Sequence, residues 1–360
     1  MAPILSPRVH EVIERYRRFY ASDRGGLMVR CSCDFGVPWP GTTPLNKLDW
    51  EDEAAVRAYA RAFTDYVKAL IRARAGVDDD YLPGVQVLAG TGMVAAAFVA
   101  DAVLHMEKDT NYLDPPINSW RDGFDQIGFR PENPWYRAQM KVLSAYIDEW
   151  DGSFAICPYT HFDPLDLANQ FRGNNLFYDF TEEEGNLRAL LKRCTESVLA
   201  LEADIHASHL RGYALPGTGI GGLWIPAGNY LSCDAGDMMS PAQLEQWGLP
   251  CTESLCRHWG GAYMHHHELG AHQLQTWSRC DKLCVQFLNR DPNTRHMPEL
   301  IDSAVIESTF RVAVHFIATY ADFMAHAEEW RHGKFCTTVI CENPQEARAV
   351  ARKLPALRNF

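Results

Sequence analysis

The chain lacks the features that would place it in a membrane or on a nucleic acid. Its most apolar stretch, residues 85–104, is interrupted by Gly90, Gly92 and Asp101, whereas a membrane span needs about 20 consecutive apolar residues. Basic residues are in the minority, with 34 Lys and Arg against 46 Asp and Glu and a formal charge of −12. Nucleic-acid affinity comes from cations that neutralise phosphates. We therefore expect neither a membrane protein nor a nucleic-acid binder.

Signals for export and for disulfide bonding are also lacking. Residues 1–10 have neither the basic segment nor the apolar core of a signal peptide. The 11 cysteines are odd in number and scattered along the chain, which is typical of reduced thiols rather than of a disulfide framework. These observations predict a cytoplasmic protein. With 360 residues, 47% of them hydrophobic, it can bury a sizeable core.

Short apolar segments alternate with helical patterns, and no low-complexity segment or repeat divides them. A first helix is expected over residues 8–20. Strands are expected within residues 26–33, 83–88, 154–157, 222–234, 261–267, 282–288 and 335–341, and a single long helix over residues 180–207. Strands alternating with helices form a parallel sheet, and this number over about 340 residues favours a (β/α)8 TIM barrel. We predict one α/β barrel domain over residues 1–360, with residues 1–25 as an N-terminal helical extension.

Such a barrel carries its active site on the loops that follow the strands. The polar segments just beyond the predicted strands are therefore the candidates. They are residues 33–34, 91, 159–163, 234–237, 265–268, 289–291 and 341–343. Within them we take Asp34, Tyr159, Glu268 and Asn289 as candidate substrate contacts.

Three consecutive histidines end one of the predicted strands. Side chains alternate along a strand with a period of two, so His265 and His267 share one face and His266 points the other way. Two imidazoles on one face can bind zinc or another divalent metal. A solvent-facing polar turn is the alternative interpretation. Cys341, at the end of the last predicted strand, is the best candidate for a third ligand.

Two further segments could move protons. Asp234 follows a strand and precedes a helix that Ser240 and Pro241 begin, so its carboxylate could act as an acid or base or could bind a cation. His161 stands beside Tyr159 at another strand end, where either side chain could exchange a proton or line a pocket. Both segments could equally have a structural role.

Several familiar motifs are absent. The chain has no Walker A lysine, no G-x-S-x-G elbow and no C-x-x-C pair. The glycines of residues 217–222 precede their strand, whereas a dinucleotide-binding fingerprint requires them to follow one. Phosphate-loop, α/β-hydrolase and dinucleotide-binding functions therefore receive no support.

Taken in order, these landmarks resemble the uroporphyrinogen decarboxylase superfamily, which includes zinc-dependent, corrinoid-linked methyltransferases. The segment 232–250 (SCDAGDMMSPAQLEQWGLP) is similar to a signature in which an aspartate and a glycine precede SP-x-x-F-x-x-F-x-x-P. Leu244 and Trp247 stand in for the two phenylalanines. The resemblance covers roughly residues 8–355 and implies a single barrel domain.

The resemblance also implies which residues hold the metal and the substrate. The methyltransferase branch uses His-x-Cys at one strand end and a second Cys at the end of the last strand. His265 and Cys341 match two of these positions, and His267 takes the place of the first Cys. Of two substrate-binding arginines in the decarboxylases, Arg30 matches the first, whereas Asp34 stands near the second. Tetrapyrrole decarboxylation is therefore not expected.

We carry three functional hypotheses from the sequence. The leading one is a metal-dependent methyltransferase, in which zinc or another divalent metal activates a small thiol and a separate corrinoid protein is the partner, since the chain has no cobalamin-binding D-x-H-x-x-G motif. The second is a metal-assisted decarboxylase or lyase that uses Asp234 and His161. The third is a non-catalytic barrel that binds a small-molecule ligand. A homodimer is the default expectation for the assembly.

Overall fold

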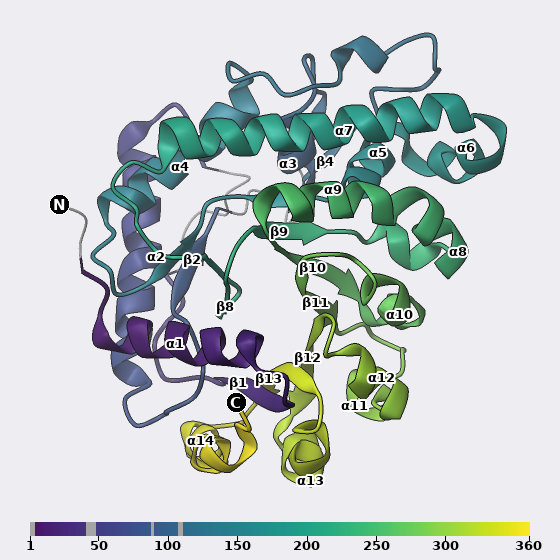
Figure 1. The fold of residues 1–360 in the computed structure, drawn as a ribbon. Coiled ribbons are helices and arrows are strands. Elements are labelled where there is room, and N and C mark those ends of the chain that lie inside the picture. Colours follow the sequence, from purple (N-terminus) through teal and green to yellow (C-terminus); the bar gives the residue numbers. More distant parts are fainter. Residues whose placement is uncertain (1–3, 41–47, 88–89, 107–110) are drawn as a thin grey trace.

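A central parallel sheet is flanked by helices (Figure 1). The structure is a computed structural model, and it describes residues 4–40, 48–87, 90–106 and 111–360. Seven strands pair in the order β1-β13-β12-β11-β10-β9-β6. These are β1 (Gly26–Ser32), β6 (Thr160–Phe162), β9 (Asn229–Ser232), β10 (Ala262–His267), β11 (Leu283–Asn289), β12 (Ala313–Thr319) and β13 (Lys334–Ile340).

Three pairs of short strands lie outside this sheet. The parallel pair is β2 (Gly84–Gln86) with β5 (Ala155–Cys157). The antiparallel pairs are β3 (Leu104–Met106) with β4 (Asn111–Leu113), and β7 (Thr218–Ile220) with β8 (Leu223–Ile225).

The helices follow the strands along most of the chain. They are α1 (Pro7–Ala21), α2 (Glu53–Ala73), α3 (Thr91–Ala96), α4 (Pro134–Asp148), α5 (Pro164–Arg172), α6 (Leu176–Glu182), α7 (Glu184–Asp204), α8 (Pro241–Gln243), α9 (Leu249–Trp259), α10 (Leu274–Trp277), α11 (Met297–Leu300), α12 (Ser303–Ser308), α13 (Tyr320–Trp330) and α14 (Pro344–Leu357). Several begin at a side-chain cap. The Ser240 hydroxyl and the Gln243 side chain form a reciprocal capping box at α8, as the Ser-Pro pair predicted.

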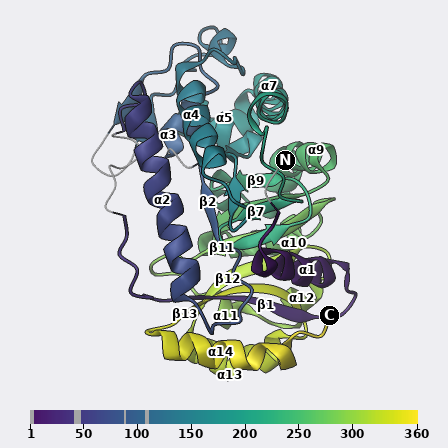
Figure 2. The same cartoon turned by 90° about the vertical axis from the view of Figure 1, so that its left-hand side faces the viewer.

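Different clusters of apolar side chains cover the two faces of the sheet. On one face, Val314, Val339 and their neighbours pack against Phe323 of α13 and Val350 of α14. On the other face, α1 and the β7–β8 pair pack against residues such as Met28 and Tyr263. In Figure 2, α13 and α14 lie below the strands, and α2 runs upright along their left-hand side. This layering leaves the carboxyl ends of the strands to carry the polar loops.

Carboxylate side chains join β1 to the segment before β2. The backbone N–H groups of Val29 and Cys31 donate to the side chains of Asp80 and Asp79, at 2.9 and 2.7 Å. In return, the Asp80 N–H donates to the Val29 carbonyl at 2.7 Å. The polar backbone groups on this edge of β1 are therefore satisfied largely by side chains, where a strand ladder would otherwise do so.

The structure agrees with the predicted α/β class and with most of the predicted strands. Leu88, the end of the predicted strand 83–88, lies outside the described residues. The predicted closed barrel differs from what the described residues form, which is a seven-stranded sheet and a separate β2–β5 pair. Strand β12 was not predicted from the sequence, because His315 interrupts its apolar run.

The predicted long helix over residues 180–207 is wrong at its start. Helix α6 runs to Glu182, and α7 begins at Glu184. Glu183 between them has φ −136° and ψ 35°, which breaks the helical backbone. No helix in the described ranges is long and apolar enough to cross a lipid bilayer.

Candidate metal centre

Three side chains converge at the carboxyl ends of β9 and β10. His265 and His267 occupy alternate positions on β10, so both project from the same face of the strand. Asp234 lies two residues beyond the end of β9, which pairs with β10 in parallel register. In the described part of the chain these three residues are the one group of metal-ligand type whose donor atoms all lie within 4.8 Å of one another.

The distances within this group suit a metal ion. The Nε2 atoms of His265 and His267 are 3.3 Å apart. Zinc–nitrogen bonds of about 2.0–2.1 Å in a tetrahedral site place two ligand nitrogens about 3.3–3.4 Å apart. Asp234 Oδ1 lies 3.8 Å from each of the two nitrogens. The Asp234 side chain is 52% exposed, so it has room to close this slightly wider gap.

The electrostatics of the site favour the metal-binding form of His265 but not that of Asp234. Burial, followed by the neighbouring His267 and His266, lowers the pKa of His265 to about 3. His265 is therefore a neutral imidazole at neutral pH, with a nitrogen lone pair to offer. Burial raises the pKa of Asp234, and His267 opposes that change. A bound cation would favour the ionised carboxylate still further.

Two more aspartates orient His267. Asp291 Oδ1 lies 2.8 Å from His267 Nδ1, so the Nδ1–H can donate to this carboxylate while Nε2 faces His265 and Asp234. The backbone N–H of His267 donates to Asp237 Oδ2 at 2.8 Å. Asp237 Oδ1 also contacts Nδ1 of the fully buried His266 at 3.3 Å. A carboxylate that holds the second nitrogen of a histidine is the usual support of a metal ligand.

A fourth aspartate holds Asp234 through its backbone. The N–H groups of Asp234 and Ala235 donate to the Asp166 carboxylate at 2.9 and 2.7 Å. Ser232 Oγ donates to Asp234 Oδ1 at 3.2 Å. Asp166 is buried at the start of α5, so the loop that carries Asp234 is anchored to the protein interior.

The Asp291 contact leads to a first prediction. Asp291→Ala should weaken metal binding about 10–100-fold, because His267 loses the group that orients its ring. Titration of the metal-free variant with zinc measures this change directly. Asp281→Ala, which removes an exposed carboxylate paired with Arg257, is the control and should bind zinc like the parent. An unchanged zinc affinity in Asp291→Ala would show that Asp291 does not support the site.

The sequence-predicted ligand Cys341 does not join this group. Strand alternation puts Cys336 and Thr338 on the inner face of β13, and Val339 and Cys341 on the face that packs on α14. Cys341 is 4% exposed, and its Sγ lies 3.8 Å from the Val339 carbonyl. A hydrogen bond from Cys31 lowers the pKa of the Cys341 thiol. The candidate ligand group therefore consists of two imidazoles and a carboxylate.

The predicted catalytic residue His161 also lies elsewhere. On β6 it is in register with Leu231, whose side chain belongs to the core beneath the helices. Its Nε2 lies 2.9 Å from Glu202 of α7, and its ring packs against Trp259 of α9. Tyr159 is buried as well and accepts a 3.3 Å hydrogen bond from Gln139 of α4. Both side chains face the helices rather than the metal group. Residues 159–163 were expected beyond a strand end, whereas residues 160–162 form the buried strand β6.

The other predicted contacts occupy varied positions. Asp34 is exposed and accepts from the Gly36 N–H at 2.7 Å. Glu268 is buried and directed at the loop beyond β11, with Oε2 2.6 Å from His296 Nδ1 and Oε1 accepting from the Met297 N–H at 2.9 Å. Asn289 is half-buried at the end of β11, in register with His267. Of these three, Asn289 occupies the strand position that neighbours His267 of the candidate metal group.

Arg30 is placed inside the sheet, on the face that carries Tyr263 and His315. Its Nε donates to Thr338 Oγ1 at 2.6 Å, and its Nη1 donates to the Gly221 carbonyl. Thr338 Oγ1 is also 2.8 Å from His315 Nε2. Among the described side chains no carboxylate lies within ion-pair distance of Arg30. Burial lowers the pKa of its guanidinium, and Arg30 is a half-buried cation that has no carboxylate partner among the described side chains.

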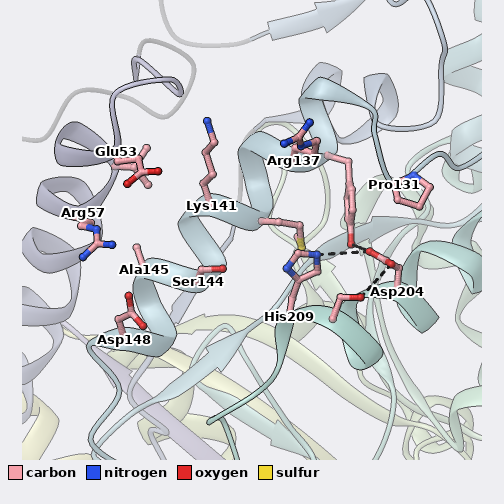
Figure 3. A pocket seen from close by; sticks show the side chains of 14 residues that line it. Glu53, Arg57, Pro131, Arg137, Lys141, Ser144, Ala145, Asp148, Asp204 and His209 are labelled. Atoms are coloured by element: carbon pink, nitrogen blue, oxygen red, sulfur yellow. Dashed lines mark hydrogen bonds and ion pairs between the residues drawn. The ribbon is translucent and has the colours of Figure 1, made fainter.

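A larger hollow lies apart from these residues. Figure 3 shows a groove of about 490 Å³ between α2 and α4, where Tyr136 Oη donates to Asp204 Oδ2 at 2.6 Å. Arg57 and Lys141 face it together with Glu53 and Asp148. Charges of both signs line the groove, so it has no preference for a ligand of one charge.

Two comparisons with known proteins found no match. The scan against protein families found no family model that matches the chain. The search of curated proteins also found no match. The chemistry of the site must therefore be argued from its own residues.

Proposed function

We propose that the chain is a divalent-metal-dependent enzyme with a barrel of the uroporphyrinogen decarboxylase type, and that it transfers a methyl group to a small thiol. The observation that supports it most is the convergence of His265, His267 and Asp234, with Asp291 behind His267. Three protein ligands with one open position are typical of catalytic zinc sites. Structural zinc sites instead use four protein ligands.

The barrel itself is part of the proposal. Strands β5 and β6 are separated by two residues and act as one strand, so β1, β2, β5–β6 and β9 to β13 make eight. β2 pairs with β5 on one side, and the segment before it reaches β1 through the Asp79 and Asp80 side chains on the other. These contacts support a closed ring of strands in which the Asp79 and Asp80 side chains, rather than backbone hydrogen bonds, join β1 to the segment before β2. The metal group then lies at the carboxyl end of that ring, where barrel enzymes carry their active sites.

The residues divide the work of the proposed reaction. His265 and His267 would supply nitrogen donors, and Asp234 would supply a carboxylate oxygen. A zinc ion held there would lower the pKa of a substrate thiol, so that the thiolate forms near neutral pH. The thiol proton leaves to solvent, which reaches the site beside the half-exposed Asp234. The thiolate sulfur then forms a bond to the methyl carbon as the bond between that carbon and its donor breaks.

The methyl donor belongs to the proposal as well. We take it to be the cobalt-bound methyl group of a separate corrinoid protein, as the resemblance implies. Replacing two thiolate ligands by an imidazole and a carboxylate makes the metal less electron-rich. A substrate thiolate is then the one soft donor in the set, which favours its binding at the open position.

Metal-dependent methyl transfer from methylcobalamin tests this function. The metal-free protein, loaded with one equivalent of zinc, is mixed with methylcobalamin and either 2-mercaptoethanol or homocysteine. We expect the methyl thioether, detected by mass spectrometry, at a rate that falls to background without zinc and in His265→Ala. Methyl transfer at equal rates with and without zinc would overturn the metal-dependent mechanism.

Arg30 favours a second candidate. A half-buried guanidinium with no carboxylate partner among the described side chains is suited to bind a substrate carboxylate, which fits a metal-assisted decarboxylase or lyase. Release of carbon dioxide from small carboxylic acids, without a methyl donor and dependent on Arg30, would support this candidate over methyl transfer.

A further inference from the structure

A second cavity lies at the amino-terminal end of β9, whereas the metal centre lies beyond the carboxyl end of that strand. It has a volume of about 540 Å³ and is bordered by residues 226–229, which lead into β9, and by the end of α9. Asp234 follows the carboxyl end of β9, whereas Asn229 begins the same strand. The cavity therefore does not share ligands or space with the metal group. Its volume is within the range of about 300–1,000 Å³ that is usual for small-molecule sites.

A buried carboxylate lines this cavity. Glu202 is 3% exposed, and its Oε2 lies 2.9 Å from Nε2 of the fully buried His161. Burial alone would raise the pKa of Glu202, but the contacts with His161 and then with His206 lower it to about 2. Glu202 therefore carries its negative charge at neutral pH. Buried charges need partners, because desolvation is costly when the charge is left uncompensated.

One oxygen of Glu202 lacks a good partner. His206 Nε2 lies 2.8 Å from Oε1, but not in the direction in which its N–H would donate, so Oε1 receives no hydrogen bond from the described residues. His206 is on the same helical segment, and its side chain is 64% exposed. An exposed histidine can turn outward at low cost. Oε1 would then face the cavity.

The rest of the lining suits a cation with an apolar body. Leu199, Leu215 and Pro226 supply apolar walls, and Trp259 supplies an aromatic ring. None of the described residues that line the cavity is a lysine or an arginine. A positive charge near Glu202 gains a charge-assisted hydrogen bond, and an aromatic or apolar group packs favourably on an indole ring.

We propose that this cavity binds an organic ammonium ion, whose N–H group takes the place of His206 on Glu202 while its apolar part packs against Trp259. The His206 side chain shields the Glu202 carboxylate until the ligand displaces it. The site is independent of the proposed methyl transfer, because it lies at the opposite end of the strands from the metal centre.

Calorimetric titration with benzylammonium chloride tests the site. We expect saturable binding of one equivalent to the full chain, and the same affinity with and without zinc. Glu202→Gln should weaken binding about 10–100-fold, because the charged acceptor is lost. His206→Ala should tighten binding, because the competing side chain is gone. Glu196→Gln, an exposed glutamate on the same helix that pairs with Lys192, is the control and should bind like the parent.

Benzyl alcohol separates recognition of charge from simple filling of an apolar hollow. It has the same ring and nearly the same size but carries no charge, and we expect it to bind at least 10-fold more weakly. Equal affinity for the alcohol and the ammonium would overturn the proposal. So would the absence of benzylammonium binding to both the parent and His206→Ala. Because His206 is exposed, that variant should fold normally even if Glu202→Gln does not.

Discussion

Asp234→Ala is expected to lose its bound metal, whereas Cys341→Ala is expected to keep it. The Asp234 carboxylate lies 3.8 Å from both imidazole nitrogens, so its removal leaves two protein ligands. The loss of affinity should exceed the roughly 10–100-fold that follows removal of an outer partner. Cys341 is buried against α14, and its thiol has no path to the metal.

Elemental analysis of untagged protein, purified without added metal, measures both variants against the parent. The parent should carry about one equivalent of zinc or of another divalent metal, and Asp234→Ala should carry almost none. Because Asp234 is half exposed, its loss should leave the melting temperature of the metal-free protein nearly unchanged. Metal retained in Asp234→Ala but lost in Cys341→Ala would restore the ligand set that the family resemblance implies.

Asp79→Ala is expected to cost about 3–5 kcal/mol of the free energy of unfolding. The Asp79 side chain is almost fully buried, accepts from the Cys31 N–H and pairs with the buried Arg74. Its removal leaves a buried guanidinium without its carboxylate and a strand N–H without its acceptor. Both losses act at the same place, the junction between β1 and β2.

Urea unfolding, followed by circular dichroism, measures this cost. Asp151→Ala is a suitable comparison, because Asp151 is half exposed and pairs with Lys68 at 3.0 Å. A surface ion pair is worth at most about 1 kcal/mol, so this control should unfold close to the parent. If Asp79→Ala proved as stable as Asp151→Ala, the side chains would not hold β1 to its neighbour.

The parts of the molecule that local patterns determine could be predicted. The period-two argument correctly placed His265 and His267 on one face of β10, with His266 on the other. The Ser240–Pro241 pair correctly marked the start of α8. In each instance the deciding interactions lie within a few residues along the chain. Whether the three donors bind metal stays a prediction.

The errors arise where the outcome depends on the face of a strand or on distant partners. Cys341 lies at the end of β13 as predicted, but side-chain alternation turns it toward α14 rather than toward the metal group. His161 was expected beyond a strand end, but it belongs to β6 and faces the helices. Asp291 and Asp237 were among the candidate residues beyond the strands. That both contact His267 could not be predicted, because the three residues are distant in sequence and meet only in the folded chain. The use of Asp79 and Asp80 to satisfy β1 has no local sequence signature.

The pairing of β1 with β13 has a consequence for how the chain reaches its native state. Gly26 lies opposite Lys334 in this ladder, so β1 is synthesised long before β13, its backbone partner in the sheet. Contacts between such distant segments slow folding, because a long loop must be closed before they contribute. Until then, β1 can be stabilised only by packing against α1 and by hydrogen bonds to Asp79 and Asp80. We infer that this strand is protected latest during synthesis and is exposed first when the C-terminal strand is removed.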